Sequence, residues 1–235
     1  MKNLLSCLFL SAVVVSFFCC QPKSADTTDT AEKTEKTEEK KTNVKPEEKK
    51  LSKTGYQVGD VVEDFSLKNT NDEMIALSDY KDEEGVIVIF TCNTCPYAVA
   101  YEDRIIELHE EFSQNGFPVI AINPNDPEVK PGDSFEAMKV RAQEKRFSFA
   151  YVFDEAQSVY PKWGATRTPE IYLLKNQDDG TMKVAYTGAI DNNWKDAASA
   201  DEHYLAKAIK AVKTGVEPDP NFTKAIGCTI KVKKN

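Results

Sequence analysis

Histidine is scarce in this sequence of 235 residues, which contains only two, His109 and His203. A histidine-rich metal site is therefore excluded. Positive charge is also in short supply, because from residue 55 onward twenty Lys and Arg stand against thirty Asp and Glu. Such an acidic domain repels phosphate backbones and anionic lipid surfaces at long range. Only a short tail of lysines opposes it, so nucleic-acid binding is not expected.

Aromatic residues are absent from residues 21–54, which are mainly Lys, Glu and Thr with almost nothing apolar. This segment cannot bury enough surface to offset the conformational entropy lost on ordering. It is predicted to be a solvated tether. Residues 55–235 contain every Trp and Tyr of the chain, and this length matches one domain with its own core.

The first 20 residues contain one early Lys, an apolar stretch over residues 4–18 and two cysteines at the end. This layout predicts a secretory signal that is too short for a comfortable membrane span. It has no A-x-A cleavage pattern and resembles the lipobox of bacterial lipoproteins, although Phe18 stands where a small residue is common. The resemblance implies lipidation of Cys20 and a domain tethered to the bacterial cell envelope, facing the periplasm or the exterior. An ordinary signal or an uncleaved anchor is the alternative.

Short apolar runs rich in β-branched residues predict the strands of the domain. Two pairs of runs flank turns and predict hairpins, and the runs that are apolar throughout predict strands buried on both faces. The predicted strands are residues 64–67, 74–77, 86–91, 117–123, 149–153, 171–174 and 182–187.

Apolar residues recur on one helical face over residues 96–115, which predicts a helix there. Glu102 and His109 are expected on its exposed side. A second helix over residues 133–146 is predicted to have Asp133 as its N-cap. With a final helix near the C-terminus, this order predicts an α/β fold with a mixed central sheet flanked by helices and an N-terminal β-hairpin extension.

Two cysteines, Cys92 and Cys95, lie between a predicted buried strand and a predicted helix. Exposed N–H groups and the helix dipole stabilise a thiolate at such a junction, and the thiolate is the nucleophile of disulfide exchange. Pro96 suits the first helical position. We therefore predict that Cys95 attacks as the helix-cap thiolate and that Cys92 resolves, while the opposite order stays open.

In these features the sequence resembles the redoxin branch of the thioredoxin-like superfamily. The resemblance lies in GDVVEDFSL, in VIVIF before the CxxC motif and in ATRTPEIYLL, whose Thr168-Pro169 is similar to the family's cis-proline beside the cysteines. It implies a thiol-disulfide oxidoreductase that exchanges disulfides with protein thiols or a small thiol and requires no bound cofactor. Glu170 is a candidate proton shuttle. If Cys95 takes the place of the family's first cysteine, Ala98 stands where the family usually has its second cysteine. The sequence departs from the family pattern at this position.

Two other functions stay open. A peroxiredoxin-like thiol peroxidase would need Pro at 88 and Thr at 92 for the P-x-x-x-T-x-x-C signature that ends on Cys95, where this chain has Val88 and Cys92. A non-catalytic binding module on the same fold would keep its function without the cysteines. Cys228 is either a buried free thiol or an additional resolving partner. A zinc site would need all three cysteines and a histidine to converge and is not expected.

Overall fold

The structure is a computed structural model that describes residues 55–234. The predicted signal peptide, Cys20 and the predicted tether lie outside the described residues. Within residues 55–234, none of the helices combines the length and the apolar content needed to cross a bilayer.

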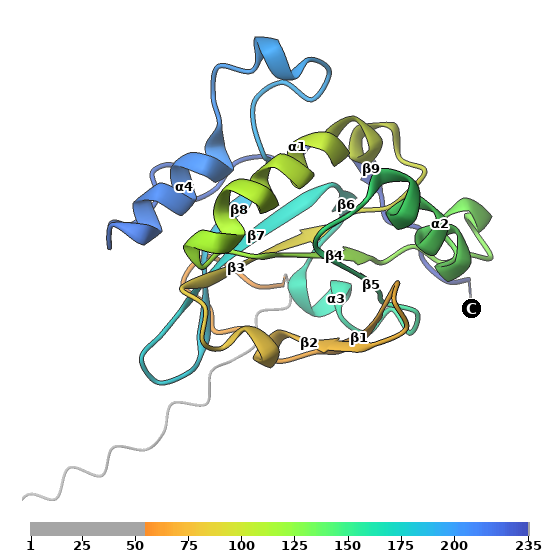
Figure 1. The fold of residues 1–235 in the computed structure, drawn as a ribbon, viewed down its shortest axis with the longest axis horizontal. Helices are drawn as coiled ribbons and strands as arrows, with labels where there is room; N and C mark the ends of the chain where they lie inside the picture. Colours follow the sequence, from red (N-terminus) through yellow and green to blue (C-terminus); the bar gives the residue numbers. More distant parts are fainter. Residues whose placement is uncertain (1–54, 235) are drawn as a thin grey trace, which may run out of the picture. The chain divides into compact units, whose positions relative to one another are not determined.

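The strands of the described residues build one large mixed sheet and one small sheet. The strands are β1 (Ser66–Asn69), β2 (Met74–Ala76), β3 (Gly85–Phe90), β4 (Val119–Asn123), β5 (Ala150–Phe153), β6 (Arg167–Thr168), β7 (Glu170–Asn176), β8 (Met182–Gly188) and β9 (Cys228–Thr229). The large sheet has the order β2-β1-β5-β4-β3-β7-β8, and β6 pairs with β9 separately (Figure 1). Strands β3, β4 and β5 are parallel, whereas the hairpins β1–β2 and β7–β8 pair with them antiparallel. The predicted mixed sheet with its N-terminal hairpin is confirmed.

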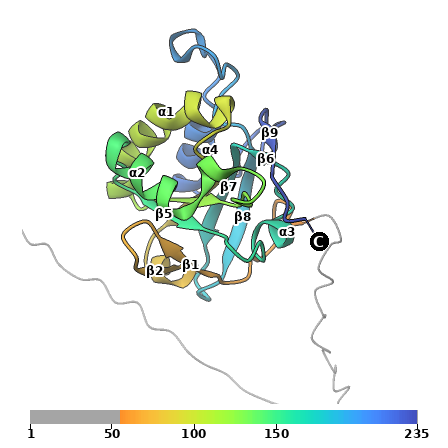
Figure 2. The same cartoon turned by 90° about the vertical axis from the view of Figure 1, so that its right-hand side faces the viewer.

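The α-helices of the described part lie on both faces of the large sheet. They are α1 (Pro96–Phe112), α2 (Phe135–Lys145), α3 (Tyr160–Trp163) and α4 (Tyr204–Lys213). Helices α1, α2 and α4 cover one face, while α3 lies on the other (Figure 2). The expectation of a sheet flanked by helices is therefore confirmed.

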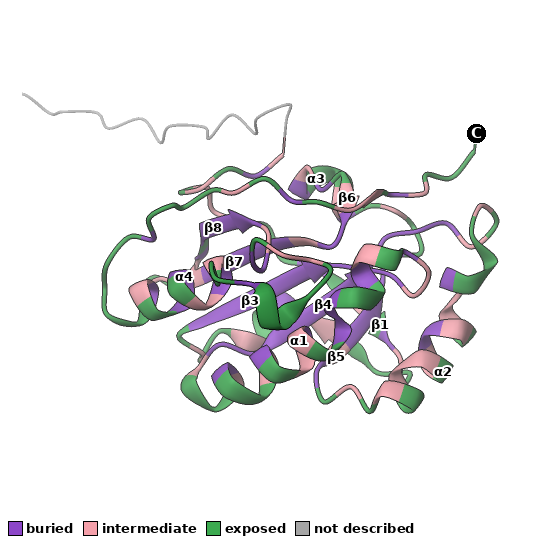
Figure 3. Ribbon diagram, turned by 90° about the horizontal axis from the view of Figure 1, so that it is seen from above, coloured by how far each residue is buried: buried purple, intermediate pink, exposed green. Residues whose placement is uncertain are grey.

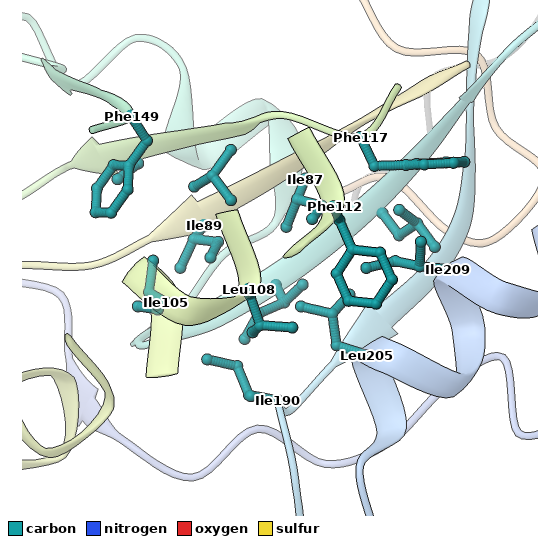
Figure 4. Packing of buried hydrophobic residues seen from close by; sticks show 14 of the residues in the cluster. Ile87, Ile89, Ile105, Leu108, Phe112, Phe117, Phe149, Ile190, Leu205 and Ile209 are labelled. Carbon is teal, nitrogen blue, oxygen red and sulfur yellow. The ribbon is translucent and has the colours of Figure 1, made fainter. Parts of the chain in front are cut away.

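Strand β3 is buried along its whole length, as is β4 (Figure 3). The side chains of β3 alternate between two cores. Ile87 and Ile89 pack on one face with residues of α1 and α4, such as Ile105 and Leu205 (Figure 4). Phe90 packs on the opposite face with α3. This packing on both faces explains the continuous apolar run. It also fixes the point at which the chain leaves the sheet and enters the CxxC loop.

Two polar residues of α1 that were predicted to be exposed are not. Glu102 is only 4% exposed, because its carboxylate accepts hydrogen bonds from Arg141 Nε at 2.8 Å and from a terminal guanidinium nitrogen at 2.6 Å. His109 is half-buried, and its Nδ1 accepts a hydrogen bond from the Val119 backbone N–H at 3.2 Å. The predictions were wrong because helical periodicity does not reveal that other elements cover this side of α1.

His109 gives the fold a pH dependence. Burial lowers the pKa of this imidazole, so the unfolded chain binds a proton that the folded chain resists. Stability is therefore present above the ordinary pKa of about 6.5 and is lost as pH falls through the lower folded pKa. Urea unfolding at about pH 7.5 and about pH 5.5 should show a smaller loss on acidification for His109→Asn than for the unsubstituted protein. His203→Asn is the matched control, because His203 is exposed, and an unchanged pH response of His109→Asn would contradict the prediction.

Candidate functional site

Cys92 and Cys95 lie in the loop that joins β3 to α1. Cys95 is the N-cap of α1, with Pro96 in the first turn. The predicted position of Cys95 at the start of the helix is therefore confirmed. Both cysteines are buried, at 3% and 4% exposed. Thr168 lies beside both of them: its Oγ1 is 3.3 Å from Cys92 Sγ, and its carbonyl oxygen is 3.1 Å from Cys95 Sγ. The structure thus brings the predicted cysteines and the predicted Thr-Pro segment together.

The Thr168–Pro169 peptide bond is cis, as the resemblance implied. Pro169 also lines a cavity of about 230 Å³ together with Tyr101, Trp194 and Ile226. Ile226 is 51% exposed. A recess with both apolar and polar walls, the latter including Asp191 and Lys224, therefore adjoins the segment that contacts the cysteines.

A third thiol belongs to the site. In the antiparallel pair β6–β9, Cys228 lies opposite Thr168, and it packs against the cluster that contains Cys92 and Cys95. Its thiol and its backbone N–H help to lower the pKa of Cys95. Gly227 permits this approach, because a Cβ there would lie 2.2 Å from the Thr168 carbonyl oxygen. All three cysteines are free, and Cys228 is half-buried.

Hydrogen bonds to the sulfur of Cys95 favour its thiolate form. The pKa of Cys95 is lowered to about 4, chiefly by the hydrogen bond from the Cys92 thiol, then by those from the Cys228 thiol and from the backbone N–H groups of Ala98 and Cys228. Burial opposes this shift. As a neutral thiol, Cys95 donates to the Thr168 carbonyl instead. Ionisation therefore exchanges one donated hydrogen bond for several accepted ones.

Asp133 holds the two residues between the cysteines. Its carboxylate is completely buried. One oxygen accepts from the backbone N–H groups of Asn93 at 2.9 Å and Thr94 at 3.0 Å, and the other accepts from Thr94 Oγ1 at 2.9 Å and Asn125 Nδ2 at 2.8 Å. The predicted role of Asp133 as N-cap of the following helix was wrong. Ser134 is the N-cap of α2, and its hydroxyl accepts the helix N–H.

The environment of Cys92 opposes its ionisation. The pKa of Cys92 is raised well above its ordinary value by the hydrogen bond to Cys95, by burial and by the charge of Asp133. The hydrogen bond with Thr168 acts weakly in the other direction. The pKa values of the two cysteines are thus shifted in opposite directions. This asymmetry favours Cys95 as the nucleophile and Cys92 as the partner that keeps its proton.

Glu170 follows the cis-proline, and its carboxylate faces the turn before it. The carboxylate accepts hydrogen bonds from the backbone N–H groups of Thr166 at 2.8 Å and Arg167 at 3.2 Å. Burial raises the pKa of Glu170, which brings it closer to the range of a proton donor. Its role as a proton shuttle stays a prediction.

The loop after β8 is fixed against α1 next to the cysteines. Tyr101 OH donates to Asp191 at 2.8 Å, and Arg104 forms an ion pair with the same carboxylate. Arg104 also donates to the Trp194 carbonyl at 2.7 Å. The Trp194 ring lies 4.2 Å from the ring of Tyr97, centroid to centroid. Trp194 is therefore held beside the residue that follows Cys95-Pro96.

The sulfur environment predicts a distinctive labelling profile. Iodoacetamide labelling of Cys95 should reach its half-maximum at a pH well below that of an ordinary thiol, because its pKa is lowered, while Cys92 stays unreactive at neutral pH because its pKa is raised. Cys92→Ala should move the Cys95 midpoint upward, since it removes the strongest stabilising hydrogen bond. Cys228→Ala should move it less. Peptide mass spectrometry after labelling at graded pH measures each site, and faster labelling of Cys92 than of Cys95 would contradict the assignment.

Comparison with known sequences gives the family of the chain. The model of the AhpC/TSA family matches residues 58–187, which is more than half of the chain. The chain is 28% identical over 127 residues to the glutathione peroxidase homolog BsaA of Halalkalibacterium halodurans, covering 45% of this chain and 80% of that protein. It is 25% identical over 100 residues to the chloroplastic peroxiredoxin Q of Sedum lineare, covering 43% of this chain but only 50% of that protein.

Solved structures with the same fold extend the comparison over more of the chain. An uncharacterized conserved protein of Geobacillus kaustophilus matches with a TM-score of 0.71 and 28% identity, covering 77% of this chain and 94% of that one. A hypothetical protein of Sinorhizobium meliloti matches with a TM-score of 0.71 and 25% identity, covering 77% and 97%. A putative thiol:disulfide interchange protein DsbE of Chlorobium tepidum, with a TM-score of 0.51 and 23% identity over 68% and 99%, shares the fold. The fold is thioredoxin-like, and the chain belongs to the AhpC/TSA family.

Proposed function

We propose that this protein is an extracytoplasmic thiol-disulfide oxidoreductase that exchanges disulfides with protein or small-thiol partners through Cys92 and Cys95. The observation that carries the proposal is the asymmetry of the pair: a thiolate is favoured at Cys95, and a protonated thiol lies beside it at Cys92. Membership of the AhpC/TSA family supports a redox role for the chain.

The reaction needs two thiolate attacks. The Cys95 thiolate attacks one sulfur of the partner's disulfide, so that a mixed disulfide forms and the partner's other sulfur leaves as a thiolate. Cys92 then loses its proton and attacks Cys95 Sγ. The Cys92–Cys95 disulfide forms, and the second partner thiolate is released. The partner gains two electrons and the protein loses two, and the reverse sequence oxidises a dithiol. Electrons pass between sulfurs, so the steps require no bound cofactor.

The order of the steps follows from the environment of Cys92. While Cys95 is a free thiolate, its hydrogen bond with Cys92 is the largest cause of the raised pKa of Cys92. That contribution disappears when Cys95 Sγ enters a mixed disulfide, because the sulfur no longer bears the charge. Cys92 therefore ionises more easily once there is a bond for it to attack. Asp133 keeps the intervening loop fixed through both steps.

The partner surface proposed for this site is the recess beside the cis-proline. Pro169 and Trp194 line it, and the exposed Ile226 adds apolar area. The proposed location rests on the sequence: an exported chain with lipidation at Cys20 would reach its partners in the bacterial cell envelope. The acidic surface fits a membrane attachment through that anchor alone.

A thiol peroxidase is the second candidate function. A glutathione peroxidase homolog and a peroxiredoxin are among the relatives of the chain, and a Cys95 thiolate is the group that attacks a hydroperoxide. Attack on the O–O bond would give Cys95 sulfenic acid and an alcohol or water, and Cys92 would then form the disulfide and release water. Val88 and Cys92 stand where the peroxidatic signature needs Pro and Thr, so the exchange reaction is preferred.

Cysteine mapping after oxidation separates these functions. The reduced full chain is treated with stoichiometric hydrogen peroxide or, separately, with a small-molecule disulfide, quenched with an alkylating agent over time and mapped by mass spectrometry. Fast formation of Cys92–Cys95 from the disulfide with slow reaction towards peroxide is the expected result. Rapid peroxide oxidation beginning at Cys95 would make the protein a peroxidase. Slow reaction with both oxidants would instead indicate a binding module.

A further inference from the structure

The cysteine pair is enclosed, and the third thiol is not. Cys92 is 3% exposed and Cys95 is 4% exposed, so a disulfide between them offers little sulfur surface to a thiol from solution. Cys228 is only half-buried, and it lies on β9, which has two residues and pairs with β6 alone within the described residues. Disulfide exchange requires a thiolate to reach a sulfur of the bond it breaks. A more exposed sulfur in contact with the pair would therefore be easier for a recycling thiol to reach than Cys92 or Cys95.

Cys228 has direct access to that buried pair. It packs against the cluster that contains Cys92 and Cys95, and its strand partner is Thr168, the residue in contact with both other cysteines. Gly227 brings the two backbones close together, because any side chain there would collide with the Thr168 carbonyl. The approach of Cys228 is thus built into the fold by specific backbone pairing.

We propose that Cys228 is the exit thiol of the site: it displaces Cys92 from Cys95 and presents the disulfide to a recycling thiol at the surface. This inference rests on the proposed exchange function. In the first step, Cys228 thiolate attacks Cys95 Sγ, the Cys92–Cys95 bond breaks, the Cys95–Cys228 bond forms and Cys92 leaves as a thiolate that takes up a proton. The first step changes the position of the disulfide and not the redox state of the protein.

Recycling follows at the half-buried sulfur of Cys228. A small thiol in its thiolate form attacks Cys228 Sγ, so that Cys95 leaves as its stabilised thiolate and a mixed disulfide remains on Cys228. A second thiolate attacks that mixed disulfide and releases the small-molecule disulfide and the Cys228 thiolate. Two thiols are oxidised and one protein disulfide is reduced, so the electrons balance. Cys95 is a good leaving group because its pKa is low.

The charges around Cys228 depend on whether Cys95 is a thiolate or part of a disulfide. Burial, the hydrogen bond with Cys95 and the Cys95 charge raise the pKa of Cys228 to about 11, while Lys231 and Lys130 lower it. Once Cys95 is in a disulfide, its charge and the hydrogen bond to it are gone and the two lysines remain. Cys228 therefore becomes a better nucleophile when a disulfide is present. The lysines also favour an anionic small thiol, which makes glutathione a suitable probe.

The test uses the full chain and two independent measurements. Cys92→Ser, oxidised with a stoichiometric small disulfide and mapped by mass spectrometry, should form a Cys95–Cys228 disulfide. In the second measurement, the Cys92–Cys95 disulfide of Cys228→Ser should be reduced by glutathione at least about tenfold more slowly than that of the unsubstituted protein. Thr229→Ala is the matched control, because it alters the neighbouring exposed residue of β9 and leaves the thiol. It should recycle at the unsubstituted rate.

The outcomes distinguish this inference from the function on which it rests. If Cys92–Cys95 forms in exchange but Cys228→Ser is recycled at the unsubstituted rate, the exit role is wrong and the oxidoreductase proposal stands. A Cys92→Ser variant that retains a mixed disulfide on Cys95 without a Cys95–Cys228 bond would overturn the exit role even if Cys228→Ser failed to fold. If no disulfide forms at Cys95 in the unsubstituted chain, the proposed function itself fails.

Discussion

Cys95→Ser should reduce disulfide exchange by about 10³-fold or more, whereas Cys92→Ser should retain the attack of Cys95 on the partner and lose only the Cys92–Cys95 product. The difference arises because the Cys95 thiolate is the attacking group and Cys92 acts only on the mixed disulfide that Cys95 has formed. Serine is the right replacement at position 92, since its hydroxyl can still donate to the Cys95 sulfur and preserve part of the thiolate stabilisation.

The measurement is turnover with a disulfide substrate, together with mass spectrometry of the trapped adducts. Cys92→Ser should form a partner disulfide on Cys95 that Cys228 then resolves to a Cys95–Cys228 disulfide, whereas Cys92→Ser combined with Cys228→Ser should accumulate the partner adduct on Cys95. Cys95→Ser should form no comparable adduct on Cys92, whose pKa is raised. A substrate adduct on Cys92 that forms at the normal rate in Cys95→Ser would reverse the assignment and support the opposite order of attack.

The sequence predicted the parts of this site that depend on local order along the chain. The apolar run of β3 and the proline after Cys95 were enough to place Cys95 at the start of α1, because a buried strand and a helix N-terminus each leave a local pattern. The Thr168–Pro169 segment was found through its resemblance to a known fold. Its contact with the cysteines depends on the antiparallel pairing of β7 with β3, which no local pattern specifies.

The contacts that tune the cysteines were not predictable in the same way. Cys228 reaches Cys95 through a strand of two residues, which is too short to give an alternating pattern. Asp133 has the residue type and position of a helix cap, yet its carboxylate lies on the loop of Asn93 and Thr94, about forty positions earlier in the chain. In both cases a short polar side chain has several partners within reach, and only the tertiary arrangement selects one.

Removing the Asp133 carboxylate should damage both stability and the asymmetry of the cysteines. Asp133→Ala leaves the part-buried N–H groups of Asn93 and Thr94 and the buried Asn125 amide without their acceptor, which should cost about 3 kcal/mol of unfolding free energy. For a domain of this size that corresponds to a melting temperature lower by roughly 6–12 °C. Thermal unfolding followed by circular dichroism measures this loss.

Asp133→Asn isolates the electrostatic part of the effect. It keeps the shape and one acceptor oxygen but removes the negative charge that helps to raise the pKa of Cys92. The pH profile of Cys92 labelling should therefore shift to lower pH, while Cys95 keeps its acidic midpoint. Asp154→Asn is the matched control, because Asp154 is also fully buried and accepts backbone N–H groups, from residues 158–160 on a different loop.

The two aspartates separate a structural role from an electrostatic one. Both substitutions should lower the melting temperature, because each weakens hydrogen bonds to a buried carboxylate. Only Asp133→Asn should change the labelling of Cys92, since only Asp133 contributes its charge to that thiol. If the two variants lose similar stability and neither shifts the Cys92 profile, Asp133 serves the loop alone, and the protonated state of Cys92 must then come from burial and from Cys95.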